Sequence, residues 1–127
     1  SCAPWWGSNM RHYIGYTSRG ETVFRNVRQD DEGVPLLLFA ENETRRVEID
    51  LAPMLDPGET ISTATASGSG ITASISNTAT AATLTLSSPS AWGEITTTIT
   101  LSTGDVITSL IRARINARQA SQAAYAL

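Results

Sequence analysis

The sequence predicts an all-β protein, and three observations support this prediction. Short segments between residues 34 and 115 alternate apolar residues with Thr, Ser or charged residues, which is the period of a half-buried strand. Groups of turn-forming residues separate these segments, for example Asp56-Pro57-Gly58 and Thr103-Gly104-Asp105. The chain is rich in Thr, Ser and Ala but holds only two Phe, which favours a thin sandwich with polar faces over a helical enzyme.

Length and charge narrow the class of protein further. The 127 residues suffice for one domain with terminal arms. A net charge of −3 gives no case for nucleic-acid binding, which needs a basic face. The single cysteine, Cys2, excludes an intrachain disulfide, and no apolar run approaches the ~18 residues that span a bilayer. Because the first residues lack the basic and apolar segments of a signal peptide, we expect a cytoplasmic product.

Residues 1–33 are expected to form an arm followed by a β-hairpin. The arm, residues 1–10, carries the adjacent Trp5 and Trp6, which either cap the core of their own domain or dock into a neighbouring subunit. Residues 11–16 and 21–27 are strand-like and are joined by a turn at residues 17–20. The candidate interaction residues of the predicted hairpin are Arg11, Tyr13, Tyr16, Phe24 and Arg25.

A sandwich of seven strands is predicted over residues 34–115. The apolar run 34–40 fits a strand buried on both faces. Residues 45–51 alternate cleanly, with Val47, Ile49 and Leu51 on one face, and we expect them to pair with residues 36–40 as a hairpin. The remaining strands are expected at residues 60–66, 71–76, 82–86, 94–101 and 106–114, with a flexible turn at residues 67–70.

The spacing of about 8–12 residues between strands is typical of an immunoglobulin-like sandwich. Small inward residues, namely Thr63, Ala73 and Thr97, are expected to let the two sheets approach closely. Trp92 is expected to plug one end of the sandwich core. The tail, residues 116–127, is rich in helix-forming Ala, Gln and Arg, with Tyr125 and Leu127 as possible anchors. It either packs as a last helical turn or orders on binding a partner.

The sequence contains no pattern that indicates catalysis. A single histidine, His12, and one distant cysteine do not make a zinc site. The consecutive acids 30–32 lack the alternating spacing of a calcium loop, so we expect them to form a solvated loop. No serine lies in a Gly-x-Ser-x-Gly elbow, and a phosphate-binding Gly-Lys loop is impossible without lysine. We therefore expect a protein that is not an enzyme and needs no metal or cofactor.

The region from Asp50 to Arg114 resembles the small immunoglobulin-like structural proteins of tailed bacteriophages. The residues that carry the resemblance are the run Leu55–Ser62, the Thr-rich strands after it, the turn at residues 103–105, and Arg112-Ala-Arg114. The resembling proteins include head decoration (cement) proteins and small fibre–tail adaptors.

The resemblance implies a virion structural protein on the outer surface of the head, made in the bacterial cytoplasm. As a decoration protein it would bridge subunits of the major capsid protein and assemble as a homo-trimer, with no nucleic acid or membrane as partner. A tail, connector or fibre-attachment protein is the first alternative. An adhesin-like or carbohydrate-binding sandwich unrelated to phage is the second.

Overall fold

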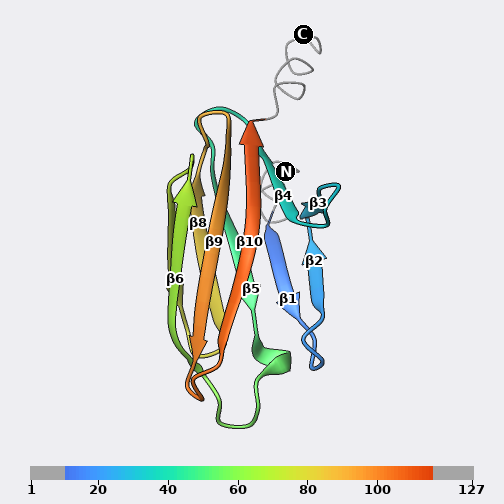
Figure 1. The fold of residues 1–127 in the computed structure, drawn as a ribbon, viewed down its shortest axis with the longest axis vertical. Coiled ribbons are helices and arrows are strands. Elements are labelled where there is room, and N and C mark those ends of the chain that lie inside the picture. The colour runs from blue at the N-terminus through green and yellow to red at the C-terminus, as the bar shows by residue number, and fades with distance from the viewer. Residues whose placement is uncertain (1–10, 116–127) are drawn as a thin grey trace, which may run out of the picture.

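The computed structural model describes residues 11–115 and shows an all-β fold of two five-stranded sheets packed as a sandwich (Figure 1). One 3-10 turn, Ala52–Met54, interrupts the strands. The strands are β1 (His12–Tyr16), β2 (Thr22–Arg25), β3 (Arg28–Gln29), β4 (Pro35–Phe39), β5 (Thr44–Asp50), β6 (Ile61–Ser69), β7 (Ala73–Asn77), β8 (Ala81–Ser87), β9 (Trp92–Leu101) and β10 (Val106–Ile115).

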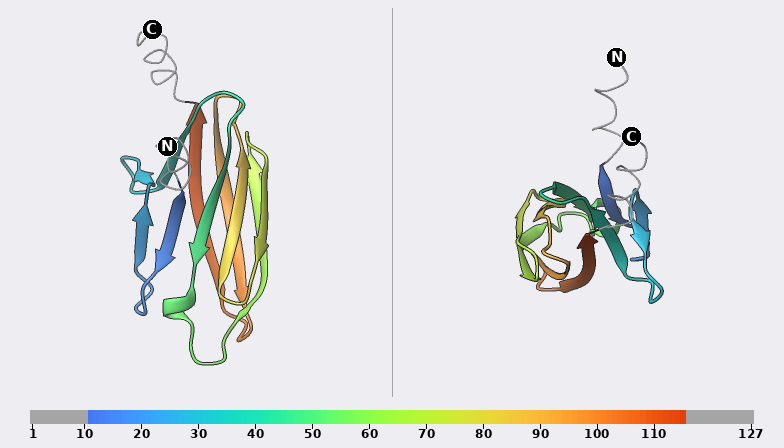
Figure 2. Two further views of the ribbon diagram at one scale, coloured as in Figure 1. Left: turned by 180° about the vertical axis from the view of Figure 1, so that it is seen from behind. Right: turned by 90° about the horizontal axis from the view of Figure 1, so that it is seen from above.

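The first sheet has the strand order β2-β1-β5-β8-β7 and the second has the order β3-β4-β10-β9-β6. All neighbouring strands are antiparallel except β1 with β5 and β4 with β10, which are parallel. Seen end-on, β6 and β7 close one side of the sandwich, and the first strands stand at the other side (Figure 2). The first three strands therefore extend both sheets on one side.

The core lies between the inward faces of the two sheets, and the alternation that predicted them is confirmed. In β9, Ile95, Thr97 and Ile99 are at most 1% exposed, while Thr96 between them is exposed. In β5, Val47 and Ile49 are buried and Glu48 is exposed. Because a one-residue slip would turn each apolar set to solvent, this alternation defines the register of the strands.

The predicted N-terminal hairpin is confirmed, since β1 and β2 pair from Tyr13↔Arg25 to Tyr16↔Thr22. Gly20 closes the turn at φ +80°, a conformation that glycine adopts without steric cost. β1 then joins the first sheet through its parallel pairing with β5, from His12↔Val47 to Gly15↔Asp50. This pairing places Tyr13 and Gly15 on the outer face of the sheet, beside Glu48 and Asp50.

The predicted hairpin between β4 and β5 is wrong, because the two strands belong to different sheets. β4 pairs with β3 and β10, whereas β5 pairs with β1 and β8. The connection turns through Asn42, at φ +61°, and crosses from one sheet to the other. The crossing brings Phe39 and Val47, both 0% exposed, into one core from opposite sheets. A hairpin would have left these apolar faces side by side instead of facing each other.

Three further expectations are corrected. Thr63 is exposed rather than inward, because a bulge between Ile61 and Thr63 shifts the register and turns Ala64 and Ala66 inward. The segment 67–69, expected as a turn, continues β6, and the reversal occurs at Gly70. Trp92 does not plug the core, since 60% of its surface is exposed. Its side chain lies on the outer face of the second sheet at the start of β9, and the next residue, Gly93, faces the core.

Candidate functional site

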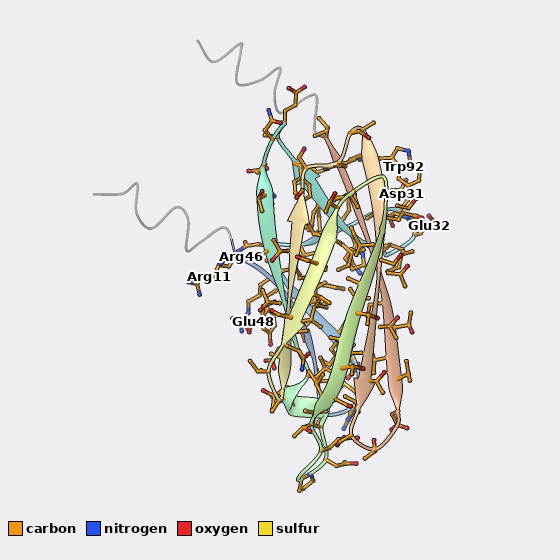
Figure 3. All side chains as sticks on the ribbon, turned by 90° about the vertical axis from the view of Figure 1, so that its left-hand side faces the viewer. Arg11, Asp31, Glu32, Arg46, Glu48 and Trp92 are labelled. Carbon is orange, nitrogen blue, oxygen red and sulfur yellow. The ribbon has the colours of Figure 1, made fainter. Side chains whose placement is uncertain are left out.

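The outer face of the first sheet carries a hollow of about 580 Å³, which we call the arginine hollow. Neighbouring strands supply its walls, and Figure 3 shows Arg11, Arg46 and Glu48 together on this side of the molecule. Residues at alternate positions of a strand share one face, so these side chains project to the same side. The hollow is lined by Arg11, His12, Tyr13, Arg25, Arg46, Glu48 and Thr83.

Tyr13 forms the floor of the arginine hollow. Its ring lies across Gly15, where a Cβ atom would meet the phenol, so a larger residue at this position would displace the ring. Its hydroxyl donates a 2.9 Å hydrogen bond to Asp50 Oδ2, and this bond raises the pKa of Tyr13. The guanidinium of Arg25 lies 5.0 Å from the ring centroid, in a cation–π contact. Tyr13 and Arg25 are therefore held in place before any partner binds.

The arginines of the hollow lack acidic partners in the described part of the chain. Among residues 11–115, the salt bridges are made by Arg45 and Arg112, and none involves Arg11, Arg25 or Arg46. Three guanidinium groups against the single carboxylate of Glu48 leave an excess of positive charge in the hollow. The hollow is thus suited to bind carboxylates, which arginine recognises with two parallel hydrogen bonds.

His12 lies behind the hollow, only 5% exposed, and holds the hairpin against the sandwich. Its Nδ1 lies 2.6 Å from the carbonyl oxygen of Asn26, and its Nε2 lies 3.3 Å from Arg45 Nη1. This arrangement fits a neutral ring in which Nδ1–H donates to the carbonyl and Nε2 accepts from arginine. Burial lowers the pKa of His12, and the nearby charge of Arg45 lowers it further.

A second charged cluster lies on the opposite sheet, around Arg112 of β10. Its Nη1 donates to Asp30 and Glu32, and its Nε donates to Glu94 Oε2 at 3.0 Å. The guanidinium holds the pKa of Asp30 below its usual range, and the three carboxylates raise that of Arg112. The acids at 30–32 were predicted as a solvated loop, but two of them bind Arg112. One cation between three anions leaves this cluster negative.

Trp92 lies beside the Arg112 cluster. It is directly opposite Arg114 in the pairing of β9 with β10, and it borders a hollow of about 240 Å³ with Leu36, Ala113 and Asp30. Figure 3 shows Trp92, Asp31 and Glu32 on the same side of the molecule, away from the residues of the arginine hollow. We call Trp92, Asp31, Glu32, Arg112 and Arg114 the tryptophan surface.

The structure brings together three of the predicted interaction residues, Arg11, Tyr13 and Arg25, in the arginine hollow. Tyr16 and Phe24 point to the interior instead. Tyr16 is 9% exposed, and its hydroxyl lies 2.7 Å from Ser109 Oγ in the opposite sheet. Four predicted interaction residues lie outside the described residues, namely Trp5, Trp6, Tyr125 and Leu127.

Arg46 and Glu48 were missed as site residues. The signal that could have found them is the alternation of residues 45–51, which places both side chains on the outer face of β5. What the alternation alone does not reveal is that β1, far away in sequence, is the neighbour of β5.

No protein-family model matches the chain, and no curated protein is significantly similar to it. Within residues 11–115, no group of three or more His, Cys, Asp or Glu side chains is placed to hold a metal ion. The same part of the chain has no helix long and apolar enough to cross a bilayer.

Proposed function

We propose that this chain is a non-enzymatic structural protein of a tailed-phage virion, a head decoration protein that bridges subunits of the major capsid protein. The observation that carries the proposal is the arginine hollow, in which three guanidinium groups lack a carboxylate partner among the described residues. A rigid sheet face with unpaired arginines suits binding to an acidic protein surface.

The arrangement of the strands supports an immunoglobulin-like fold, as the resemblance to phage proteins implies. β5, β8 and β7 are adjacent in one sheet, and β10, β9 and β6 are adjacent in the other. These orders match strands B-E-D and G-F-C of an immunoglobulin domain. On this assignment β4 takes the place of a first strand paired with the last one, and β1–β3 are additions to the sandwich.

The distribution of charge supports a role in assembly. Residues 60–93 contain no charged side chain, and the outer faces of β6, β7 and β8 carry mainly Thr and Ser. Charge is therefore concentrated on the elements other than β6, β7 and β8, which include both clusters. Arg11 also adjoins residues 1–10, so the predicted contact residue Trp6 is only five positions from the rim of the hollow.

The proposal is tested by adding the purified protein to capsids from which the decoration layer has been stripped. We expect binding, and a rise in the temperature at which the capsids release their contents. The double variant Arg11→Gln/Arg46→Gln should bind weakly, whereas Arg19→Gln/Arg28→Gln, with the same change in net charge, should bind like the wild type. Binding to isolated tails but not to capsids would assign the protein to the tail instead of the head. Binding to neither would overturn the proposal.

A further inference from the structure

The arginine hollow and the tryptophan surface have opposite charge. The hollow combines Arg11, Arg25 and Arg46 with one acid, Glu48. The tryptophan surface has Asp31 and Glu32 exposed, and the side chain of Glu32 retains 71% of its accessible area although it binds Arg112. With Asp30 and Glu94, which bind Arg112, the acids around Trp92 number four, against the two arginines Arg112 and Arg114. The two surfaces therefore carry opposite net charge.

The aromatic part of the two surfaces is also complementary. Among residues 11–115 the cation–π contacts are Arg25 with Tyr13 and Arg45 with Phe39, so no described guanidinium stacks on Trp92. An indole that is 60% exposed is costly in water and is a frequent centre of protein interfaces. Arginine is its preferred cationic partner, and the hollow presents three.

The position of the two surfaces allows both to be used at once. The hollow lies on the outer face of the first sheet and Trp92 on that of the second, on opposite sides in Figure 3. A contact between unlike surfaces of identical chains is heterologous, so each copy offers one free hollow and one free tryptophan surface to the next. Such contacts form a closed ring when the rotation between neighbours closes, and a filament when it does not.

We propose that the occupant of the arginine hollow is the tryptophan surface of a second copy of this chain. Trp92 enters the hollow against the guanidinium groups, and Asp31 and Glu32 pair with Arg11 and Arg46. This inference rests on the proposed function only in assigning the resulting assembly to a virion. It names a neighbouring copy as the partner of the hollow, so Arg11→Gln/Arg46→Gln would bind capsids weakly because the ring, and with it the multivalent contact to the capsid, does not form. The trimer expected from the phage resemblance is the smallest ring of this kind that uses both surfaces of each copy.

Sedimentation equilibrium of the isolated protein, without capsids, tests the inference. Two variants are required: a hollow variant, Arg11→Glu/Arg46→Glu, and a surface variant, Trp92→Thr/Asp31→Asn. All four positions are exposed, so both variants should retain the thermal unfolding midpoint of the wild type within a few degrees. The wild type is expected to assemble beyond a dimer as its concentration rises, and each variant alone is expected to remain monomeric.

The mixture of the two variants gives the decisive result. The hollow variant keeps an intact tryptophan surface, and the surface variant keeps an intact hollow. An equimolar mixture can therefore form one interface and no more, and we expect a one-to-one dimer. A wild type that stays monomeric up to about 1 mM, where only very weak association would escape detection, overturns the inference. So does a hollow variant that still dimerises with itself, because that contact would join like surfaces.

The outcomes for self-assembly and for capsid binding are separable. If the wild type is monomeric but Arg11→Gln/Arg46→Gln abolishes capsid binding, the hollow faces the capsid, and this inference fails while the proposed function stands. If the wild type forms rings that bind no virion component, the inference stands and the proposed function fails.

Discussion

Replacing Thr97 by valine should make the protein more stable. Thr97 lies in the middle of β9 with 0% of its surface exposed, between Ile95 and Ile99 on the inward face. Its hydroxyl is the one buried side-chain polar atom among residues 11–115 that has no hydrogen-bond partner. Leaving a buried hydroxyl unsatisfied costs about 1–3 kcal/mol, whereas valine has nearly the same shape and fits a strand equally well.

The expected gain in unfolding free energy is about 1–2 kcal/mol, since the methyl group that replaces the hydroxyl also buries apolar surface. For a chain of this length the gain corresponds to a rise of about 3–8 °C in the thermal midpoint. Urea unfolding followed by circular dichroism measures the free energy directly. Thr96→Val is the matched control, because Thr96 is the exposed neighbour in the same strand and should shift stability by less than about 0.5 kcal/mol.

A loss of stability in Thr97→Val would refute the reasoning. Ser109 is directly opposite Thr97 in the pairing of β9 with β10, and its hydroxyl already contacts that of Tyr16. A destabilised variant would mean that the hydroxyl of Thr97 forms a hydrogen bond with the Tyr16–Ser109 pair in solution. Thr97→Ser would then be less harmful than Thr97→Val, and a double-mutant cycle with Tyr16→Phe would show coupling between the two sites.

Three further predictions follow from buried or crowded groups. Because its pKa is lowered in the folded state, His12 binds a proton more readily when unfolded, so stability should fall as the pH drops below about 6.5, and His12→Gln should remove this dependence. Gly68→Ala should cost about 1–3 kcal/mol, since the added Cβ meets the backbone carbonyl oxygen of Ile71. Arg112→Gln should lower the thermal midpoint at pH 7 by leaving Asp30 and its neighbours without their cation.

Each of these predictions has a control variant or a pH comparison that isolates its cause. The His12 dependence is measured by urea midpoints between pH 7.5 and 5.5, where the usual pKa values of carboxyl groups lie below the window. Ser67→Ala, at the exposed position before Gly68, should be nearly neutral. The effect of Arg112→Gln should shrink near pH 3, where its carboxylate partners begin to take up protons; an equal loss at both pH values would show that the arginine acts through packing alone.

The inward faces of the strands were predictable from the sequence, because a strand buried on one face alternates apolar and polar residues, and this alternation is visible within a few consecutive residues. The faces of β5, β8 and β9 follow from that alternation. The pairing of strands was harder to predict from the sequence, since it depends on which strands still have an unpaired edge after the chain has crossed from one sheet to the other. β4 illustrates this, because an apolar strand followed by a turn and an alternating strand has the pattern of a hairpin, yet the turn at Asn42 joins two sheets.

The candidate site was predictable only in part, for the same reason. Arg11, Tyr13 and Arg25 belong to one hairpin and were found together. Arg46 joins them through a parallel pairing that no short-range pattern encodes. The bond between Arg112 and Asp30 joins residues 82 positions apart, so the sequence alone suggested a solvated acidic loop. Trp92 was misplaced because a large aromatic residue is usually buried, and only the register of β9 shows it facing outward.

The charge-free half of the sandwich explains why both clusters lie where they do. Residues 60–93 supply β6, β7 and β8 and no ionic side chain, so these strands can form stable sheets without offering a charged contact. Their exposed Thr and Ser keep those faces polar without specifying a partner. Every arginine of the hollow comes instead from residues 11–46, and the acids of the tryptophan surface come from the loop between β3 and β4. The additions that widen the sandwich on one side therefore supply Arg11, Arg25 and the acids 31–32 to its two charged surfaces, and Arg46 and Trp92 of the sandwich itself complete those surfaces.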